Sequence, residues 1–268
     1  MKPWRLTIVV ALLAAVPAAG QEFAKKRLEK SPRHQEYVKV RHGNREVTCL
    51  VVYPEVKDKA TAVVVIHEIF GLADWPKLLA DELAEAGYIA IAPDLLSGMA
   101  PGGGGTEKFE GRDAVTRAIR DLPPDQVTAD LNAAAAYVAK LPACNGKVAV
   151  CGFCWGGGQA FRSATNNPNL KAAFVFYGPG PDDPEAVQRI AAPVYGFYGG
   201  NDNRINAGIP RTTELMKQAG KTYEPVIYEG AGHGFMRSGE PDNPDARPGD
   251  VKAREEAWKR WKEILSKL

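Results

Sequence analysis

Histidine and cysteine are scarce in this sequence, with four of each among 268 residues. Zinc sites are built from these residue types, and the single C-x-x-C pair has no second pair to complete a structural zinc site. An excess of one charge is also lacking, because 34 lysines and arginines face 32 aspartates and glutamates. Without a strong positive field, nucleic acid is not an expected partner.

A long apolar run occurs only at the N-terminus, where Leu6–Val16 follows the charged residues Lys2 and Arg5. The small residues Pro17–Gly20 come next and supply a cleavage site. This order is typical of a secretory signal peptide, and the run is shorter than the roughly 20 residues that a membrane span needs. We therefore expect a signal peptide at residues 1–20 and an exported protein, periplasmic or secreted, that has no membrane contact after cleavage.

The rest of the chain has the composition of a folded globular protein. Hydrophobic residues make up 45% of the sequence and charged residues 25%, which excludes a disordered or fibrous chain. Residues 21–35 are polar and charged, and we expect them to form a flexible leader. Because no repeat and no change of composition follows, residues 36–268 are predicted to form one domain.

Export would place Cys49, Cys144, Cys151 and Cys154 in an oxidising compartment. Four cysteines allow three full pairings, and the sequence does not choose among them. A domain of this size does not need disulfides for its stability, so free buried thiols are an equally good interpretation for Cys49 and Cys144.

Strand and helix patterns alternate along the chain. Two alternating runs joined by a turn at Gly43-Asn44 predict an antiparallel pair of strands, and a continuous apolar run predicts a strand that is covered on both faces. Strands are predicted at 37–41, 47–53, 62–66, 88–92, 148–150, 172–177, 194–198 and 225–228, and helices at 75–86, 107–120, 125–140, up to about 165, 209–219 and 251–267. This alternation predicts an α/β fold with a mostly parallel sheet flanked by helices.

Residues 152–156 read G-F-C-W-G and have the form G-x-nucleophile-x-G, with Cys154 in the place of the usual serine. The motif lies between an apolar strand and a helix, which is the context that a nucleophile elbow requires. The turn would present the thiol above the carboxyl edge of the sheet, where the start of the helix favours a thiolate. The backbone N–H of Trp155 would then point toward an oxyanion.

Other interpretations of this segment remain open. Cys151 and Cys154 also form a C-x-x-C pair, which is the spacing of thiol–disulfide redox proteins. Thioredoxin-like domains are much shorter than this chain, and Cys151 would be buried at the end of its strand. A buried cysteine without a chemical role, in a noncatalytic binding protein on the same fold, is the third interpretation.

A nucleophile of this kind needs an acid and a histidine further along the chain. Asp202 follows the predicted strand at 194–198, and Asp182 and Asp183 are weaker alternatives beside a proline-rich turn. His233 lies between glycines just after the strand at 225–228. We therefore expect Asp202 to orient His233, and His233 to exchange protons with Cys154 and the substrate.

Four motifs together resemble the dienelactone hydrolase family. They are H-E-I-F-G at 67–71, G-F-C-W-G-G at 152–157, G-N-D at 200–202 and G-H-G-F-M-R at 232–237. The resemblance covers roughly residues 35–268, and it implies a single-domain α/β-hydrolase fold. It also implies hydrolysis of cyclic enol-lactones and related esters by a cysteine, histidine and aspartate triad, without a metal or another cofactor.

The resemblance assigns roles to residues of this chain. Cys154, His233 and Asp202 match the triad. Glu68 matches the glutamate that pairs with the resting thiol and takes its proton when substrate arrives.

Further residues match the parts of the family site that bind substrate. Ile69 and Trp155 match the donors of the oxyanion hole. Arg237 matches an arginine that binds the substrate carboxylate, and Arg112 matches a second such arginine by its spacing.

We therefore expect an exported, monomeric hydrolase that cleaves a lactone or carboxylic ester, with an anionic small molecule as its substrate. Export is unusual for a lactonase of this family. The pocket residues Phe70 and Met236 and the glycine-rich loop 97–106 need not fit a dienelactone, so the chemistry is better supported than the substrate.

Overall fold

The computed structural model describes residues 21–268. Residues 1–20, where a signal peptide is predicted, lie outside the described residues. None of the helices formed by residues 21–268 combines the length and the apolar character that a membrane span needs.

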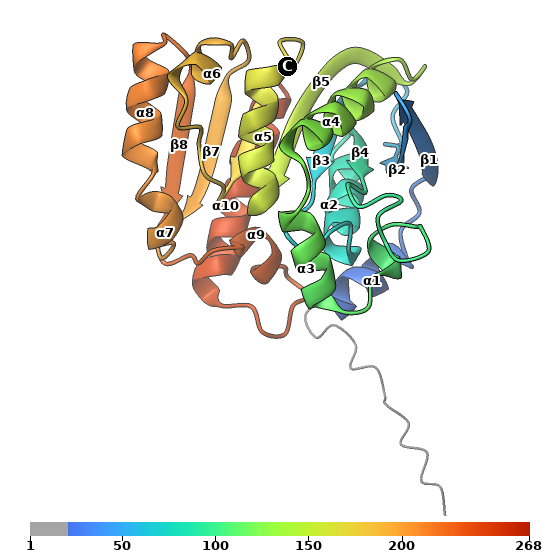
Figure 1. Cartoon of the computed structure of the whole chain (residues 1–268). Helices are drawn as coiled ribbons and strands as arrows, with labels where there is room; N and C mark the ends of the chain where they lie inside the picture. Colours follow the sequence, from blue (N-terminus) through green and yellow to red (C-terminus); the bar gives the residue numbers. More distant parts are fainter. Residues whose placement is uncertain (1–20) are drawn as a thin grey trace, which may run out of the picture.

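One sheet of eight strands forms the centre of the described part of the molecule (Figure 1). The strands are β1 (Gln35–His42), β2 (Arg45–Val52), β3 (Ala60–Ile66), β4 (Ile89–Pro93), β5 (Cys144–Phe153), β6 (Ala173–Phe176), β7 (Val194–Gly199) and β8 (Tyr223–Tyr228). Their order is β1-β2-β4-β3-β5-β6-β7-β8, and only the β1–β2 and β2–β4 pairs are antiparallel. The mostly parallel sheet predicted from the sequence is confirmed.

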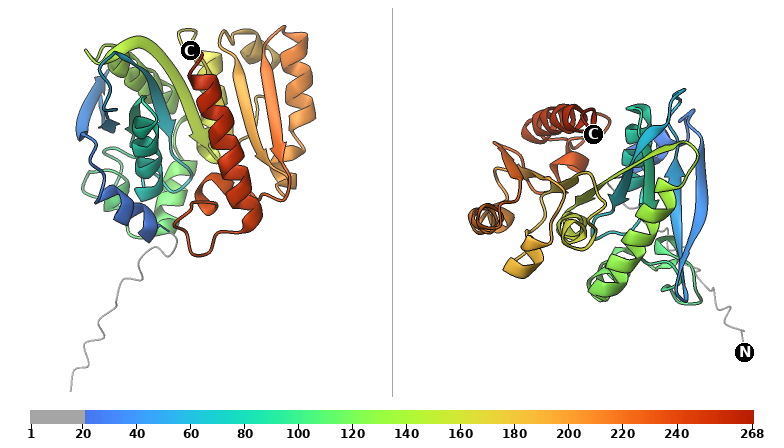
Figure 2. Two further views of the ribbon diagram at one scale, coloured as in Figure 1. Left: turned by 180° about the vertical axis from the view of Figure 1, so that it is seen from behind. Right: turned by 90° about the horizontal axis from the view of Figure 1, so that it is seen from above.

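Helices cover both faces of this sheet. They are α1 (Glu22–Leu28), α2 (Asp74–Glu85), η1 (Thr106–Lys108), α3 (Arg112–Arg120), α4 (Pro124–Ala139), α5 (Trp155–Asn166), α6 (Pro184–Gln188), α7 (Asn203–Asn206), α8 (Ile209–Gln218), α9 (Phe235–Ser238) and α10 (Pro248–Leu265). Figure 1 shows α4, α5 and α8 in front of the sheet, and the view from behind in Figure 2 shows α10, α2 and α1 on the opposite face.

The apolar pattern of the strands explains this three-layer arrangement. Every residue of β3 is buried, and successive side chains point to opposite faces. Val64 and Ile66 join the core under α4 and α5, whereas Val63 and Val65 join the core under α2 and α10. On the second face, Trp261 of α10 packs edge-on against Phe176, with ring centroids 4.9 Å apart.

The prediction of a flexible leader at residues 21–35 is wrong. Residues 22–28 form α1, and the remainder leads directly into β1 at Gln35. Phe23 and Ala24 are buried in the core under α2 and α10, although they lie in a strongly charged segment. The charged side chains have partners elsewhere in the fold, which local composition does not show: Arg27, for example, pairs with Glu82 of α2 at 2.8 Å.

All four cysteines are free thiols in this structure. Cys49, Cys144 and Cys151 are buried, whereas Cys154 is partly exposed. Of the interpretations that the sequence left open, the structure shows free buried thiols at Cys49 and Cys144.

Candidate active site

The side chains of the candidate site follow five parallel strands at the carboxyl edge of the sheet. Glu68 lies after β3, Cys154 after β5, Tyr177 after β6, Asp202 after β7 and His233 after β8. Because carboxyl ends of parallel strands meet at one edge, loops far apart in the sequence contribute to a single site.

Cys154 lies at a sharp turn between β5 and α5. Its backbone has φ 58° and ψ −118°, a conformation that residues other than glycine rarely adopt. The flanking glycines are required by contact, because a Cβ at Gly152 would lie 1.9 Å from the carbonyl oxygen of Gly156. A Cβ at Gly156 would in turn lie 2.4 Å from the carbonyl oxygen of His67. This is the geometry of a nucleophile elbow.

His233 and Asp202 form a tight pair. Nδ1 of His233 lies 2.5 Å from Oδ2 of Asp202, and the other carboxylate oxygen accepts from the backbone N–H of Ile205. The imidazole packs edge-on against the ring of Tyr177, with centroids 5.1 Å apart. Its Nε2 is buried and forms no hydrogen bond within residues 21–268, so the thiol of Cys154 is not bonded to His233 in this state.

The Cys154 sulfur is a thiol at rest. Burial, followed by the negative charge of Glu68, raises the pKa of Cys154 above its ordinary value. The backbone N–H groups of Trp155 and Ile69 and the positive charge of Arg204 oppose this rise without cancelling it. The start of the helix does favour the thiolate through the N–H of Trp155, as expected from the sequence, but desolvation outweighs this effect. These two N–H groups are the oxyanion donors predicted from the sequence, and both lie beside the sulfur.

Glu68 is buried and paired with Arg237. Nε of Arg237 donates to Oε2 of Glu68 at 2.7 Å, and the charge of Glu68 raises the pKa of Arg237. The guanidinium carbon of Arg112 lies 3.8 Å from the centre of the Phe70 ring, and that of Arg237 lies 5.7 Å from the same centre. The structure thus brings both predicted substrate arginines to one aromatic ring.

Tyr177 belongs to this site, although the sequence analysis did not name it. Its backbone has φ 41°, and its hydroxyl is buried without a hydrogen-bond partner in the described part of the chain. Burial, and then the charge of Glu68, raises the pKa of Tyr177, so the hydroxyl keeps its proton. Its place directly after a strand, like that of Cys154, was the available signal.

His67 is a second residue that the sequence analysis left without a role. It is completely buried, and burial lowers its pKa, so the imidazole is neutral. Nδ1 lies 2.8 Å from the carbonyl oxygen of Glu68, and the ring stacks on Trp155 with centroids 5.8 Å apart. His67 therefore braces the segment that carries Glu68 against the residue that follows the nucleophile.

Several predicted alternatives lie apart from this chemistry. Asp183 caps α6 by accepting from the backbone N–H of Glu185 at 2.9 Å. Cys151 is fully buried within β5, and burial raises its pKa. Neither property suits a redox partner for Cys154. Residues 21–268 contain no group of histidine, cysteine and acidic side chains placed to hold a metal ion.

The structure also shows the surroundings of two other features expected near the pocket. Met236 is fully buried in α9. The glycine-rich loop 97–106 joins the β1–β2 hairpin in lining a cavity of about 620 Å³. Phe70, in contrast, is partly exposed between the two arginines.

Comparison with known proteins agrees with this geometry. The model of the Dienelactone hydrolase family matches residues 47–268. A relative from Saccharolobus solfataricus, provisionally named a carboxymethylenebutenolidase, is 32% identical over 241 residues, which cover 77% of this chain and 89% of that protein. A relative from Escherichia coli with the same provisional name is 30% identical over 209 residues, covering 74% and 73% of the two chains.

Solved structures share the fold. A dienelactone hydrolase from Anabaena variabilis has a TM-score of 0.64 at 21% identity and covers 85% of this chain and 96% of its own. A dienelactone hydrolase-like promiscuous phosphotriesterase from metagenomic libraries has a TM-score of 0.75 at 22% identity, with coverage of 88% and 98%. These structures establish the α/β-hydrolase fold, and the family match and the sequence relatives establish more: the chain belongs to the dienelactone hydrolase family.

Proposed function

We propose that this hydrolase cleaves a lactone or carboxylic ester with Cys154 as nucleophile, His233 as proton carrier and Asp202 as the residue that orients it. The observation that carries the proposal is the elbow cysteine with two backbone N–H groups beside its sulfur, at the sheet edge that also holds the His233–Asp202 pair. In this arrangement a nucleophile, a proton carrier and an oxyanion site share one edge.

The first half of the reaction forms a thioester. The resting thiol gives its proton to Glu68, which substrate frees by competing for Arg237. The thiolate then attacks the carbonyl carbon, and the N–H groups of Ile69 and Trp155 stabilise the resulting oxyanion. As the tetrahedral intermediate collapses, the C–O bond breaks and the leaving oxygen takes the proton that Glu68 received from the thiol; in a lactone, this oxygen stays on the opened chain.

The second half releases the product. His233 takes a proton from water, and the hydroxide attacks the thioester carbon. The C–S bond breaks, the carboxylic acid leaves, and the sulfur recovers the proton from His233. Asp202 stabilises the imidazolium that forms between these steps.

The nucleophile is tested with Cys154→Ala and p-nitrophenyl esters. We expect turnover to fall by roughly 10³-fold or more, as for removal of other catalytic nucleophiles. Cys151→Ala is the matched control, since it removes a neighbouring thiol without touching the proposed chemistry. Undiminished turnover in Cys154→Ala would exclude the mechanism, and an equal loss in Cys151→Ala would favour a redox pair.

We also propose that the substrate is anionic and that the protein is exported as a monomer. A guanidinium binds a carboxylate bidentately, and Arg237 has only its Nε committed to Glu68. Arg237→Met should lose the preference for a carboxylated over a neutral ester. Export is tested by cell fractionation and by the intact mass of the protein; a cytoplasmic protein that keeps residues 1–20 would contradict it.

A further inference from the structure

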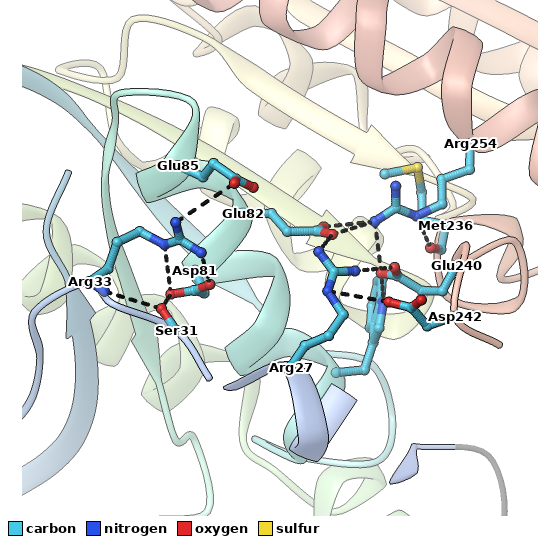
Figure 3. A network of polar contacts seen from close by, with 11 residues as sticks. Arg27, Ser31, Arg33, Asp81, Glu82, Glu85, Met236, Glu240, Asp242 and Arg254 are labelled. Carbon is cyan, nitrogen blue, oxygen red and sulfur yellow. Dashed lines mark hydrogen bonds and ion pairs between the residues drawn. The ribbon is translucent and has the colours of Figure 1, made fainter. Parts of the chain in front are cut away.

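A buried ion cluster lies behind the site, on the face of the sheet covered by α1, α2 and α10. We call it the Arg254 cluster and define it as Arg27, Glu82, Glu240 and Arg254 (Figure 3). Nη2 of Arg254 lies 2.7 Å from Glu82 and 2.8 Å from Glu240. Arg27 of α1 pairs with the same two carboxylates at 2.8 and 3.0 Å. Two arginines and two glutamates therefore alternate in this cluster, and Arg27 also pairs with Asp242 at its edge, at 3.6 Å.

This cluster is costly to bury. Glu240 and Arg254 are almost completely shielded from solvent, and so is Glu82. Apolar residues of similar size would fill such a space at least as stably, because each ion loses its hydration. Stability alone therefore does not account for the cluster, whereas fixed directional contacts are what such a group supplies.

One of those contacts leads to the active site. Nε of Arg254 donates to the backbone carbonyl of Met236 at 3.1 Å. Met236 lies in α9, a helix of only four residues that has little stability of its own. The next residue, Arg237, donates to Glu68 at 2.7 Å. An unbroken chain of contacts thus joins the Arg254 cluster to the arginine at the mouth of the site.

A second contact from α10 holds the other end of the same loop. Asp250 lies one helical turn before Arg254 and is completely buried. It accepts from the backbone N–H of Gly232 at 2.8 Å and from the hydroxyl of Ser238 at 3.0 Å. The loop 232–238 is therefore tied at both ends to one rigid helix, and Arg254 holds the part beside Arg237.

We propose that Arg254 is a positioning residue that fixes α9 and thereby sets the affinity of Arg237 for the carboxylate of the substrate. This inference rests on the proposed function, because it takes Arg237 to be the carboxylate ligand. Arg27 has a supporting role: it neutralises the second buried carboxylate and so keeps Arg254 available to Met236.

The test compares a carboxylated ester, mono-p-nitrophenyl succinate, with the neutral ester p-nitrophenyl acetate. Arg254→Met should lower kcat/KM for the carboxylated ester about tenfold, mainly through KM, while the neutral ester changes less than about twofold. Arg254→Lys keeps the charge and reaches fewer partners, so it should show a smaller loss of the same kind.

Arg33→Met is the matched control. Arg33 is also an arginine paired with a buried acid of α2, Asp81, but its group stands apart from the loop 232–238 (Figure 3). It should leave the ratio of the two esters unchanged. An equal loss for both esters in Arg254→Met, or no loss for either, overturns the inference.

Two further variants allow the inference to be tested even if Arg254→Met does not fold. Should circular dichroism show that Arg254→Met does not fold, the decision passes to Arg254→Lys and Arg27→Met; an unchanged ester ratio in both overturns the inference. Failure of the proposed function would look different. Cys154→Ala would then retain turnover, or Arg237→Met would keep the preference for the carboxylated ester in an otherwise wild-type chain.

Discussion

At the scale of single residues, the backbone of Cys154 shows what the site demands of the fold. A side chain at φ 58° costs on the order of 1–3 kcal/mol, and the surrounding structure must offset it. The offset comes from close packing of α5 on β5 and β3, which glycines at 152 and 156 permit. The strained turn sets the sulfur between two backbone N–H groups, so the strain is tied to the chemistry.

The thiol of Cys154 is expected to ionise only at high pH. Because burial and Glu68 raise its pKa, the midpoint of alkylation by iodoacetamide should lie above the ordinary value of 9.0. Glu68→Gln removes a negative charge and should lower this midpoint. Arg204→Met removes a positive charge that favours the thiolate, and it should raise the midpoint. The rate of alkylation against pH measures all three, and a midpoint that moves in the opposite direction in either variant would contradict the assignment.

Gly156 should tolerate no side chain. In Gly156→Ala, the new Cβ would meet the carbonyl oxygens of His67 and Ile66 at 2.4 and 2.6 Å, and backbone atoms cannot move aside cheaply. We expect a loss of roughly 1–3 kcal/mol in the free energy of unfolding, measured by urea titration. Gly208→Ala is the control, since its nearest neighbour lies at 3.5 Å. Equal stability of the two variants would show that the elbow can relax.

At the scale of elements, the sequence was most informative where burial leaves a pattern. The continuous apolar run at 62–66 predicted β3, and in the structure this strand begins just two residues earlier, at Ala60. β5 is longer than predicted, because it begins at Cys144, which pairs with Ala60, and the exposed residues 145–147 lie at an irregularity of the ladder and carry no apolar signal. The predicted helix at 107–120 is interrupted: Gly111 has φ 84°, and α3 starts only at Arg112.

The residues of the site were likewise predictable only where they lie in a local sequence pattern. Cys154, His233 and Asp202 lie in short motifs that a reader can find in the sequence. The residues that support them do not lie in such motifs. Arg254 and Glu82, for example, are 172 residues apart in the sequence and come into contact only in the folded protein. Contacts of this kind depend on helix packing, which local patterns do not specify.

Helix α1 should contribute to the stability of the whole domain. Phe23 is 8% exposed and packs into the core under α2 and α10. Phe23→Ala should therefore lower the free energy of unfolding by about 3 kcal/mol. Lys26→Ala, on the exposed side of the same helix, should have little effect. Equal stability of the two variants in urea titration would contradict the contribution of α1 to the core.

At the scale of the whole molecule, two sets of distant contacts meet at one loop. The parallel sheet gathers the reacting groups at its carboxyl edge, and α10 holds the loop 232–238 from behind, with α1 and α2 supplying partners for Arg254 and its cluster. The fold thus separates the groups that react from the groups that hold them. Within the Arg254 cluster, Glu240 is the residue whose pKa lies near neutrality.

Glu240 should make the stability of the protein depend on pH. Burial, and then the charge of Glu82, raises the pKa of Glu240 from 4.5 to about 7, although Arg254 and the indole N–H of Trp75 oppose the rise. Between these values the folded protein keeps a proton that the unfolded chain has lost. This contribution to stability is therefore complete below pH 4.5 and is lost as the pH rises through about 7.

Glu240→Gln cannot ionise, so its free energy of unfolding should fall less than that of the wild type across this window. Urea titrations below and above the window measure the difference. Glu85→Gln, an exposed position on α2, is the control and should keep the wild-type dependence. If the wild type and Glu240→Gln show the same slope, Glu240 is already ionised in the folded protein at low pH, and the two arginines of the cluster outweigh its burial.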